Sequence, residues 1–107
     1  MTGGRATPAH LPTKKKHDTV KFDFRGLTFE VDKTAFASLK IQTALNLGER
    51  DPRAANEAMD IVCCGHLVDY IGRIPDADGN APDELGCSAE DWAAFTSAMA
   101  EAISAKN

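Results

Sequence analysis

The sequence of 107 residues lacks any long apolar run, and this absence excludes a class of protein. No stretch approaches the roughly 20 consecutive apolar residues that a membrane-spanning helix needs. Residues 1–18 also lack the apolar core, about 7 to 15 residues long, of a secretory signal peptide. We therefore expect a cytoplasmic protein with no membrane-embedded segment.

Cysteine is scarce, and its distribution argues against a disulfide-stabilised scaffold. The chain has three cysteines, of which Cys63 and Cys64 are adjacent and Cys87 is distant. An odd number with two neighbours is a poor framework for paired bridges. The remaining composition, 43% hydrophobic and 26% charged, is that of an ordinary globular protein, and the length allows one small domain.

Basic residues are outnumbered, since 12 Lys and Arg face 16 Asp and Glu and give a net charge of −4. Residues 1–18 hold four basic residues and one Asp, for a net charge of +3, which leaves −7 on the remainder. The first segment, rich in Gly, Pro and Lys, predicts a disordered basic arm. An acidic body is repelled by phosphates, so nucleic-acid binding is not expected of it, and a DNA-binding regulator that uses the arm is a less favoured alternative.

Signatures of common catalytic and cofactor sites are absent: the chain has no G-x-x-x-x-G-K-[ST], G-x-G-x-x-G or H-E-x-x-H. Its one cluster of metal-ligand or thiol-enzyme type comprises Cys63, Cys64, His66 and Cys87. In a helix Cys64 points about 100° away from Cys63, and zinc sites favour pairs spaced by two to four residues. We interpret these as small core residues beside a histidine at the edge of the core.

An acidic loop at residues 76–80 resembles part of a calcium-binding loop. Such loops place Gly at the sixth position and Glu at the twelfth, where this chain has Ala81 and Cys87. The loop is therefore predicted to be a solvated turn. With no catalytic motif, metal site or cofactor site indicated, we predict that the protein is not an enzyme and needs no cofactor.

The clearest local pattern is a strict alternation of apolar and polar residues, which occurs twice between residues 19 and 32. This period is that of half-buried strands, and a two-residue turn at Arg25-Gly26 joins them as a β-hairpin. The resulting register places three apolar pairs on one face: Val20 with Val31, Phe22 with Phe29, and Phe24 with Leu27. Lys21 and Glu30 pair on the other face.

Helical periodicity fills most of the remaining chain and predicts helices over about 33–47, 52–74 and 88–105. Asp32, Asp51 and Ser88 precede them as N-caps, and Pro52 suits the first helical position. A polar loop over residues 75–86 separates the last two helices. The buried face of the last helix is predicted to comprise Trp92, Phe95, Met99 and Ile103. The expected fold is therefore α+β, an N-terminal β-hairpin packed against about three α-helices in one domain over residues 19–107.

The central helix is apolar around much of its circumference, which indicates contacts on two sides. A protein without a catalytic motif and with surplus apolar surface is most simply interpreted as an interaction module. The candidate residues for contact with a partner or a second copy are Ile61, Leu67, Tyr70 and Ile71.

The order of the elements from Val20 to Ile103 resembles the tail assembly chaperones of long-tailed bacteriophages and prophages. The likeness depends on element order and length, on an acidic last helix that contains Phe, and on hairpin residues Phe22, Phe24, Gly26 and Phe29. The basic arm and the loop over residues 75–86 depart from the family pattern and leave the docking geometry open.

The resemblance implies a small protein of the bacterial host cytoplasm that acts in virion assembly. It would bind the phage tape-measure protein, keep its hydrophobic helices in solution and bring tail tube protein to it, and such proteins can self-associate. No residue role carries over, because the family has no invariant signature. The alternative is a small regulatory or inhibitory protein, of phage or mobile-element origin, that binds a host protein.

Overall fold

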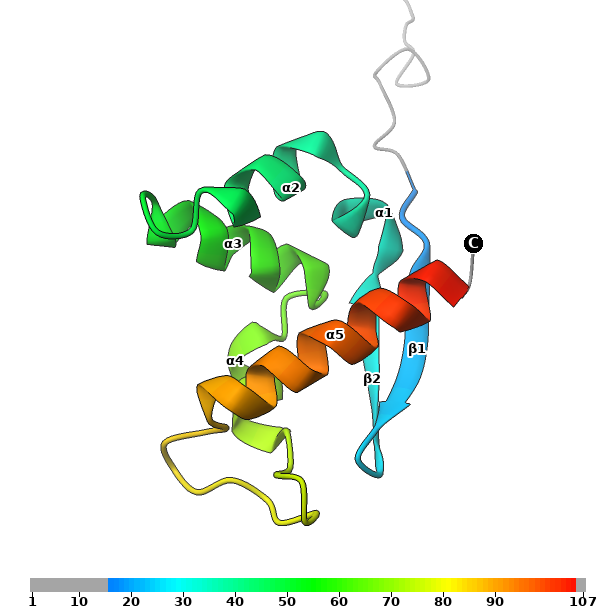
Figure 1. Ribbon diagram of the computed structural model, residues 1–107. Helices are drawn as coiled ribbons and strands as arrows, with labels where there is room; N and C mark the ends of the chain where they lie inside the picture. Colours follow the sequence, from blue (N-terminus) through cyan, green and yellow to red (C-terminus); the bar gives the residue numbers. More distant parts are fainter. Residues whose placement is uncertain (1–15, 106–107) are drawn as a thin grey trace, which may run out of the picture.

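The computed structural model describes residues 16–105, and over this range the chain is α+β, a two-stranded hairpin followed by five helices (Figure 1). Residues 1–15 of the predicted basic arm lie outside the described residues. The elements are β1 (Thr19–Phe24), β2 (Leu27–Asp32), α1 (Lys33–Phe36), α2 (Leu39–Asn46), α3 (Pro52–Val62), α4 (Leu67–Arg73) and α5 (Ala89–Ala105). No helix within this part of the chain has both the length and the apolar character needed to cross a membrane.

The hairpin confirms the predicted register. Val20 lies opposite Val31, and Phe22 lies opposite Phe29. Arg25 has φ 51° and Gly26 has φ 87°. Two consecutive residues with positive φ form the type I′ turn, whose twist matches that of the strands. Arg25 adopts this conformation although it carries a side chain, and its guanidinium donates hydrogen bonds to Pro75 O and to Asp91 Oδ1.

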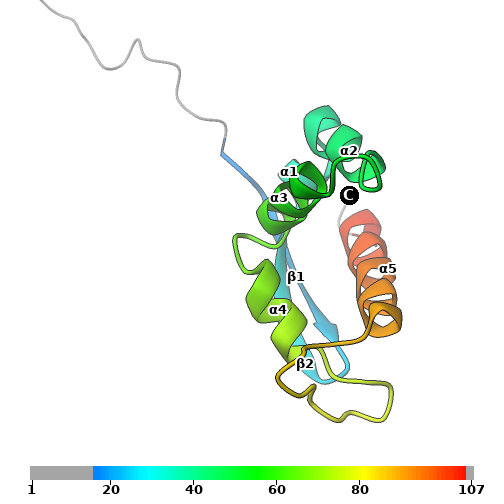
Figure 2. The same ribbon diagram turned by 90° about the vertical axis from the view of Figure 1, so that its left-hand side faces the viewer.

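The apolar face of the hairpin is covered by α5, which crosses it in a separate layer, while α4 lies beside β2 (Figure 2). Phe95 of α5 is the centre of this contact. Its ring centroid lies 5.0 Å from that of Phe29, 5.5 Å from that of Phe22 and 5.6 Å from that of Phe24. Phe95 and Phe29 are almost completely buried, so the predicted apolar face of the hairpin is part of the core.

The helix predicted over 33–47 is interrupted, and the structure has α1 and α2 in its place. Asp32 caps α1 as expected, because its Oδ1 accepts from Ala35 N at 2.8 Å. Ser38 then starts a second helix in an extended conformation, and its Oγ accepts from Ile41 N at 3.5 Å. A second N-cap residue inside the periodic stretch therefore divides it.

The helix predicted over 52–74 is also wrong in its continuity, because α3 ends at Val62 and α4 begins at Leu67. Between them Cys64 has φ 58° and Gly65 has φ 84°. Gly65 N donates to Asp60 O at 2.7 Å, which closes the end of α3 in the manner of a Schellman motif. Asp60 Oδ1 also accepts from Leu67 N at 3.0 Å, so one aspartate stabilises both sides of the corner.

Candidate functional site

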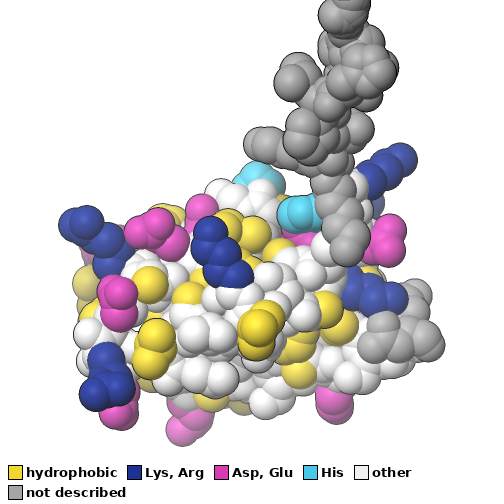
Figure 3. All heavy atoms as spheres, turned by 90° about the horizontal axis from the view of Figure 1, so that it is seen from above, with side chains coloured by type: hydrophobic (Ala, Val, Ile, Leu, Met, Phe, Trp, Pro, Cys, Tyr) yellow, Lys and Arg dark blue, Asp and Glu magenta, His cyan; other side chains and the backbone are white. Residues whose placement is uncertain are grey.

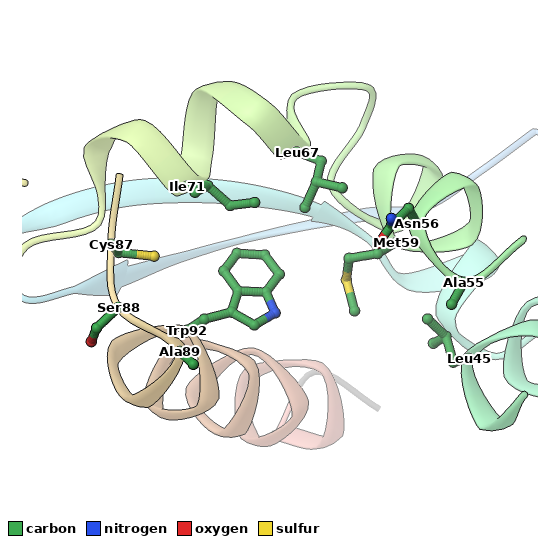
Figure 4. A pocket seen from close by; sticks show the side chains of 10 residues that line it. All are labelled: Leu45, Ala55, Asn56, Met59, Leu67, Ile71, Cys87, Ser88, Ala89 and Trp92. Atoms are coloured by element: carbon green, nitrogen blue, oxygen red, sulfur yellow. The ribbon is translucent and has the colours of Figure 1, made fainter. Parts of the chain in front are cut away.

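The candidate site is an apolar groove of about 310 Å³ between the α2–α3 pair, α4 and the start of α5 (Figure 4). Three successive parts of the chain supply its walls, and apolar side chains predominate among them. The lining residues are Leu45, Ala55, Asn56, Met59, Leu67, Ile71, Cys87, Ser88, Ala89 and Trp92.

Trp92 occupies the middle of this groove. Its indole stacks on the ring of Phe95, with centroids 5.2 Å apart and an interplanar angle of 23°. The other face of the groove is formed by Leu67 and Ile71, which lie one turn apart on α4, and by Met59 of α3 (Figure 4). Trp92 is nevertheless only half-buried. A large, rigid aromatic side chain is thus held in place by the core and still presents apolar surface to the groove.

The end of the loop before α5 closes one side of the groove against α4. Cys87 N donates to Ile71 O at 2.8 Å. Gly86 has φ 82°, and a Cβ atom at this position would lie 2.9 Å from Ile71 Cγ2. Only glycine combines this backbone conformation with so close an approach. Ser88 then caps α5 as predicted, because its Oγ accepts from Asp91 N at 3.0 Å.

Acidic residues outnumber basic ones in the part of the chain that contains α4 and α5. From residue 67 to residue 105 the chain carries one basic residue, Arg73, and eight acidic ones. Residues 16–66 carry seven basic and eight acidic residues, so nearly all the excess negative charge lies in the half that contains α4 and α5. Arg73 is itself engaged, because its Nε donates to Asp69 Oδ2 at 3.0 Å and its guanidinium lies 5.4 Å from the centroid of the Phe29 ring.

The cysteines of the predicted cluster have thiols that ionise less readily than usual. Burial raises the pKa of the Cys87 thiol, and it raises the pKa of Cys63 to about 12. His66 is exposed whereas Cys63 is completely buried, because the corner after α3 separates them. Within residues 16–105, no group of three or more His, Cys, Asp or Glu side chains is placed to hold a metal ion.

The four predicted contact residues fall in three different environments. Leu67 and Ile71 line the groove. Ile61 is 47% exposed and borders two other hollows with Lys40, of about 910 Å³ and 290 Å³, on the other side of α3. Tyr70 is 4% exposed, so its prediction as a surface contact is corrected: it lies in the core with Phe29.

Among the described residues, the most exposed large apolar side chains lie apart from one another. Seen from above, over α1 and α2, hydrophobic side chains are scattered among charged ones (Figure 3). Leu39, Val68 and Leu85 are each more than four-fifths exposed, but they lie on α2, on α4 and in the loop before α5. None of the three lines the groove.

Sequence reasoning assigned Trp92 wholly to the core and did not find Met59 or Leu45 as part of a site. The alanines next to Trp92 in the last helix predict close packing against another helix. They do not predict that part of Trp92 remains exposed. Comparisons of the chain with protein-family models, curated proteins and solved structures found no match.

Proposed function

We propose that the chain is a non-enzymatic adaptor that binds an amphipathic helix of another protein in the groove around Trp92. The observation that carries this proposal is the partly exposed indole of Trp92, which stacks on Phe95 and faces Leu67 and Ile71 across an apolar space. Tryptophan in such a position is typical of the residues that dominate binding energy at protein interfaces.

The shape of the groove supports a helix as the bound element. Helices α4 and α5 form its two sides, and an apolar stripe that recurs at i, i+3, i+4 and i+7 fits between such walls. The lining offers few hydrogen-bonding groups, mainly Asn56 and Ser88, and Ser88 is already engaged with Asp91. A bound helix satisfies its own backbone groups, whereas an extended peptide needs partners for them.

The net negative charge of the part of the chain that supplies α4 and α5 supports a partner with Lys or Arg beside its apolar stripe. Eight acidic residues and one basic residue between positions 67 and 105 give this side of the molecule a negative potential. The same charge keeps a complex dispersed after its apolar surfaces have been covered. Attraction of a basic partner and a net charge on the complex are both useful to a protein that keeps insoluble helices in solution.

Together with the resemblance in the hairpin and the element order, these features lead us to propose a phage tail assembly chaperone. Its partner would be the tape-measure protein, whose hydrophobic helices it would keep in solution in the host cytoplasm while tail tube protein is recruited. In genomic terms, an open reading frame for a very long helical protein directly downstream supports this assignment, and its absence argues against it.

Binding can be measured through Trp92, which is the only tryptophan in the chain. The probe is a synthetic amphipathic helix of leucine and lysine, and the control is the same design with glutamate in place of lysine. We expect the lysine peptide to shift the Trp92 emission to shorter wavelength and to protect it from acrylamide quenching. Equal responses to both peptides would contradict the charge argument, and no response to either would refute the groove.

A matched pair of variants tests the location of binding. Leu67 lines the groove, and its neighbour Val68 is 82% exposed and does not. Leu67→Glu is expected to weaken peptide binding by about tenfold or more, and Val68→Glu to leave it unchanged. The same pair, co-expressed with helical segments of the downstream protein, tests the chaperone assignment through the yield of soluble partner. Capture of a host protein in its place would favour the regulatory alternative.

A further inference from the structure

We propose that two copies of the chain associate through the free edge of β1, forming a continuous four-stranded antiparallel sheet. The proposal does not depend on the groove, because β1 lies on the opposite side of the hairpin from α4 (Figure 1). It commits to a second copy of this chain because the charges along β1 complement those of another β1.

The free edge follows from the register of the hairpin. In a two-residue hairpin the pair next to the turn, Phe24 and Leu27, is hydrogen-bonded, and the pairs then alternate. The N–H and C=O groups of Thr19, Lys21 and Asp23 therefore point away from β2. Within residues 16–105 the sheet has two strands only, and no backbone hydrogen bond joins these three residues to another element.

The other edge of the sheet is blocked at its centre. The Tyr70 hydroxyl accepts from Glu30 N at 3.1 Å and donates to Glu30 O at 2.6 Å. It thereby satisfies both outward-facing backbone groups in the middle of β2. Pairing through β1 would thus give a dimer whose two outer edges are both protected by Tyr70, and not an open-ended fibre.

One antiparallel register matches the charges on the polar face. When Phe22 lies opposite Phe22 of the second copy, Lys21 of each copy lies opposite Asp23 of the other. Shifting the register by two residues in either direction places Lys21 opposite Lys21 or Asp23 opposite Asp23, which is unfavourable. Neither charge forms an ion pair within the described residues, and Asp23 Oδ1 accepts a hydrogen bond from Thr28 Oγ1 at 2.7 Å.

The same register also matches the apolar face. Val20 of each copy lies opposite Phe24 of the other, and the two Phe22 side chains meet at the symmetry axis. Phe22 and Phe24 are only half-buried in the single chain, although they lie on the face that α5 covers. Pairing would therefore bury further aromatic surface and add about four main-chain hydrogen bonds. Figure 2 shows α5 in a layer in front of the strands, and in Figure 1 no other described helix or strand lies alongside β1, in the plane of the sheet, on the side away from β2.

The test is the oligomeric state of the full chain by analytical ultracentrifugation over a range of concentrations. We expect a reversible dimer. In the proposed register, Lys21→Asp makes every charged pair across the interface acidic, and Asp23→Lys makes every such pair basic. Each variant alone is expected to dimerise about tenfold less tightly or worse, whereas an equimolar mixture of the two restores dimers, since each repelled charge then meets its opposite.

Backbone variants provide the matched control. Lys21→Pro removes an outward N–H from β1, and Thr28→Pro removes one from β2 at an equally exposed position. We expect Lys21→Pro to abolish the dimer and Thr28→Pro to retain it. Circular dichroism verifies that both variants fold. A monomeric wild-type chain, a dimer indifferent to Lys21→Pro, or a mixture of charge variants that stays monomeric would each overturn the proposal.

Discussion

The hydroxyl of Tyr70 on α4 binds both backbone groups of Glu30 on β2, donating to the carbonyl oxygen and accepting from the N–H. A side chain from one helix thus takes the place of a neighbouring strand. The ring beneath this hydroxyl packs against Phe29, with centroids 5.0 Å apart and planes at 82°. The contact fixes α4 beside the hairpin and determines which sheet edge stays open.

Tyr70→Phe tests this contact. It keeps the ring in the core but leaves the N–H and C=O of Glu30 without their partner, so we expect a loss of about 1–2 kcal/mol in the free energy of unfolding. Urea denaturation followed by circular dichroism measures this. We also expect the variant to form assemblies larger than dimers, because both edges of the sheet are then open. Unchanged stability would show that the hydroxyl contributes little.

Gly86 and Gly79 form a matched pair for the wall of the groove. Both have positive φ, 82° and 87°, but a Cβ atom would meet Ile71 at Gly86 and nothing within 4 Å at Gly79. Gly79→Ala is expected to cost about 1 kcal/mol for the left-handed conformation alone. Gly86→Ala is expected to cost about 1–3 kcal/mol more and to alter Trp92 emission. Equal melting temperatures in the two variants would contradict the close approach.

Asp91 makes stability depend on acid. Hydrogen bonds from Arg25 and Ser88 hold the pKa of its carboxyl below the usual range. A carboxyl with a lowered pKa in the folded state stabilises the fold above its unfolded pKa of about 3.9, and this contribution is lost as pH falls through the folded value. Asp91→Asn should therefore lower the melting temperature at pH 7 and flatten its decline in acid.

The control for Asp91 is Asp69→Asn. Asp69 forms an exposed pair with Arg73 four residues further on, and such pairs contribute about 0.5 kcal/mol or less. We expect the melting temperature of Asp69→Asn to match that of the wild type both at pH 7 and in acid. A larger effect at Asp69 than at Asp91 would show that the Arg25 contact is not the important one.

The three thiols should differ in reactivity. Burial, with Asp60 and Cys64 nearby, raises the pKa of Cys63 to about 12, so its thiol stays protonated at pH 8. Cys64 and Cys87 are partly exposed, and burial raises their pKa values as well. With iodoacetamide at pH 8 we expect slow modification of Cys64 and Cys87, and modification of Cys63 only in denaturant, as read by peptide mass spectrometry. Early labelling of Cys63 would contradict its burial.

The hairpin was predictable because its determinants are local. The alternation around Phe22 and Phe29 and the Arg25-Gly26 turn select one register, and any slip would expose the apolar face. The N-caps Asp32, Asp51 and Ser88 were predictable for the same reason, since each bonds within its own first turn. These features need no knowledge of the rest of the chain.

The two helix breaks were missed because helical periodicity continues across them. Ser38 is a favourable N-cap residue, and Gly65 readily accepts positive φ, so each break has a local signal. The helical spacing of apolar residues on both sides of each break nevertheless predicted a continuous helix. Leu67 and Ile71 were predicted as contact residues and line the groove, but the groove itself depends on how α4 and α5 meet. Trp92 illustrates the limit: sequence shows that one side of a helix is apolar, and only packing shows which part stays uncovered.

The left-handed pair Cys64-Gly65 has a consequence for shape. If α3 continued straight into α4, the two would form one long helix beside α5. All of its apolar side chains would then pack along a single line of contact. The corner instead turns the second segment towards the hairpin, so three walls enclose a recess. The recess therefore depends on two residues that do not line it. A side chain added at position 65 is expected to impair partner binding without contacting the partner.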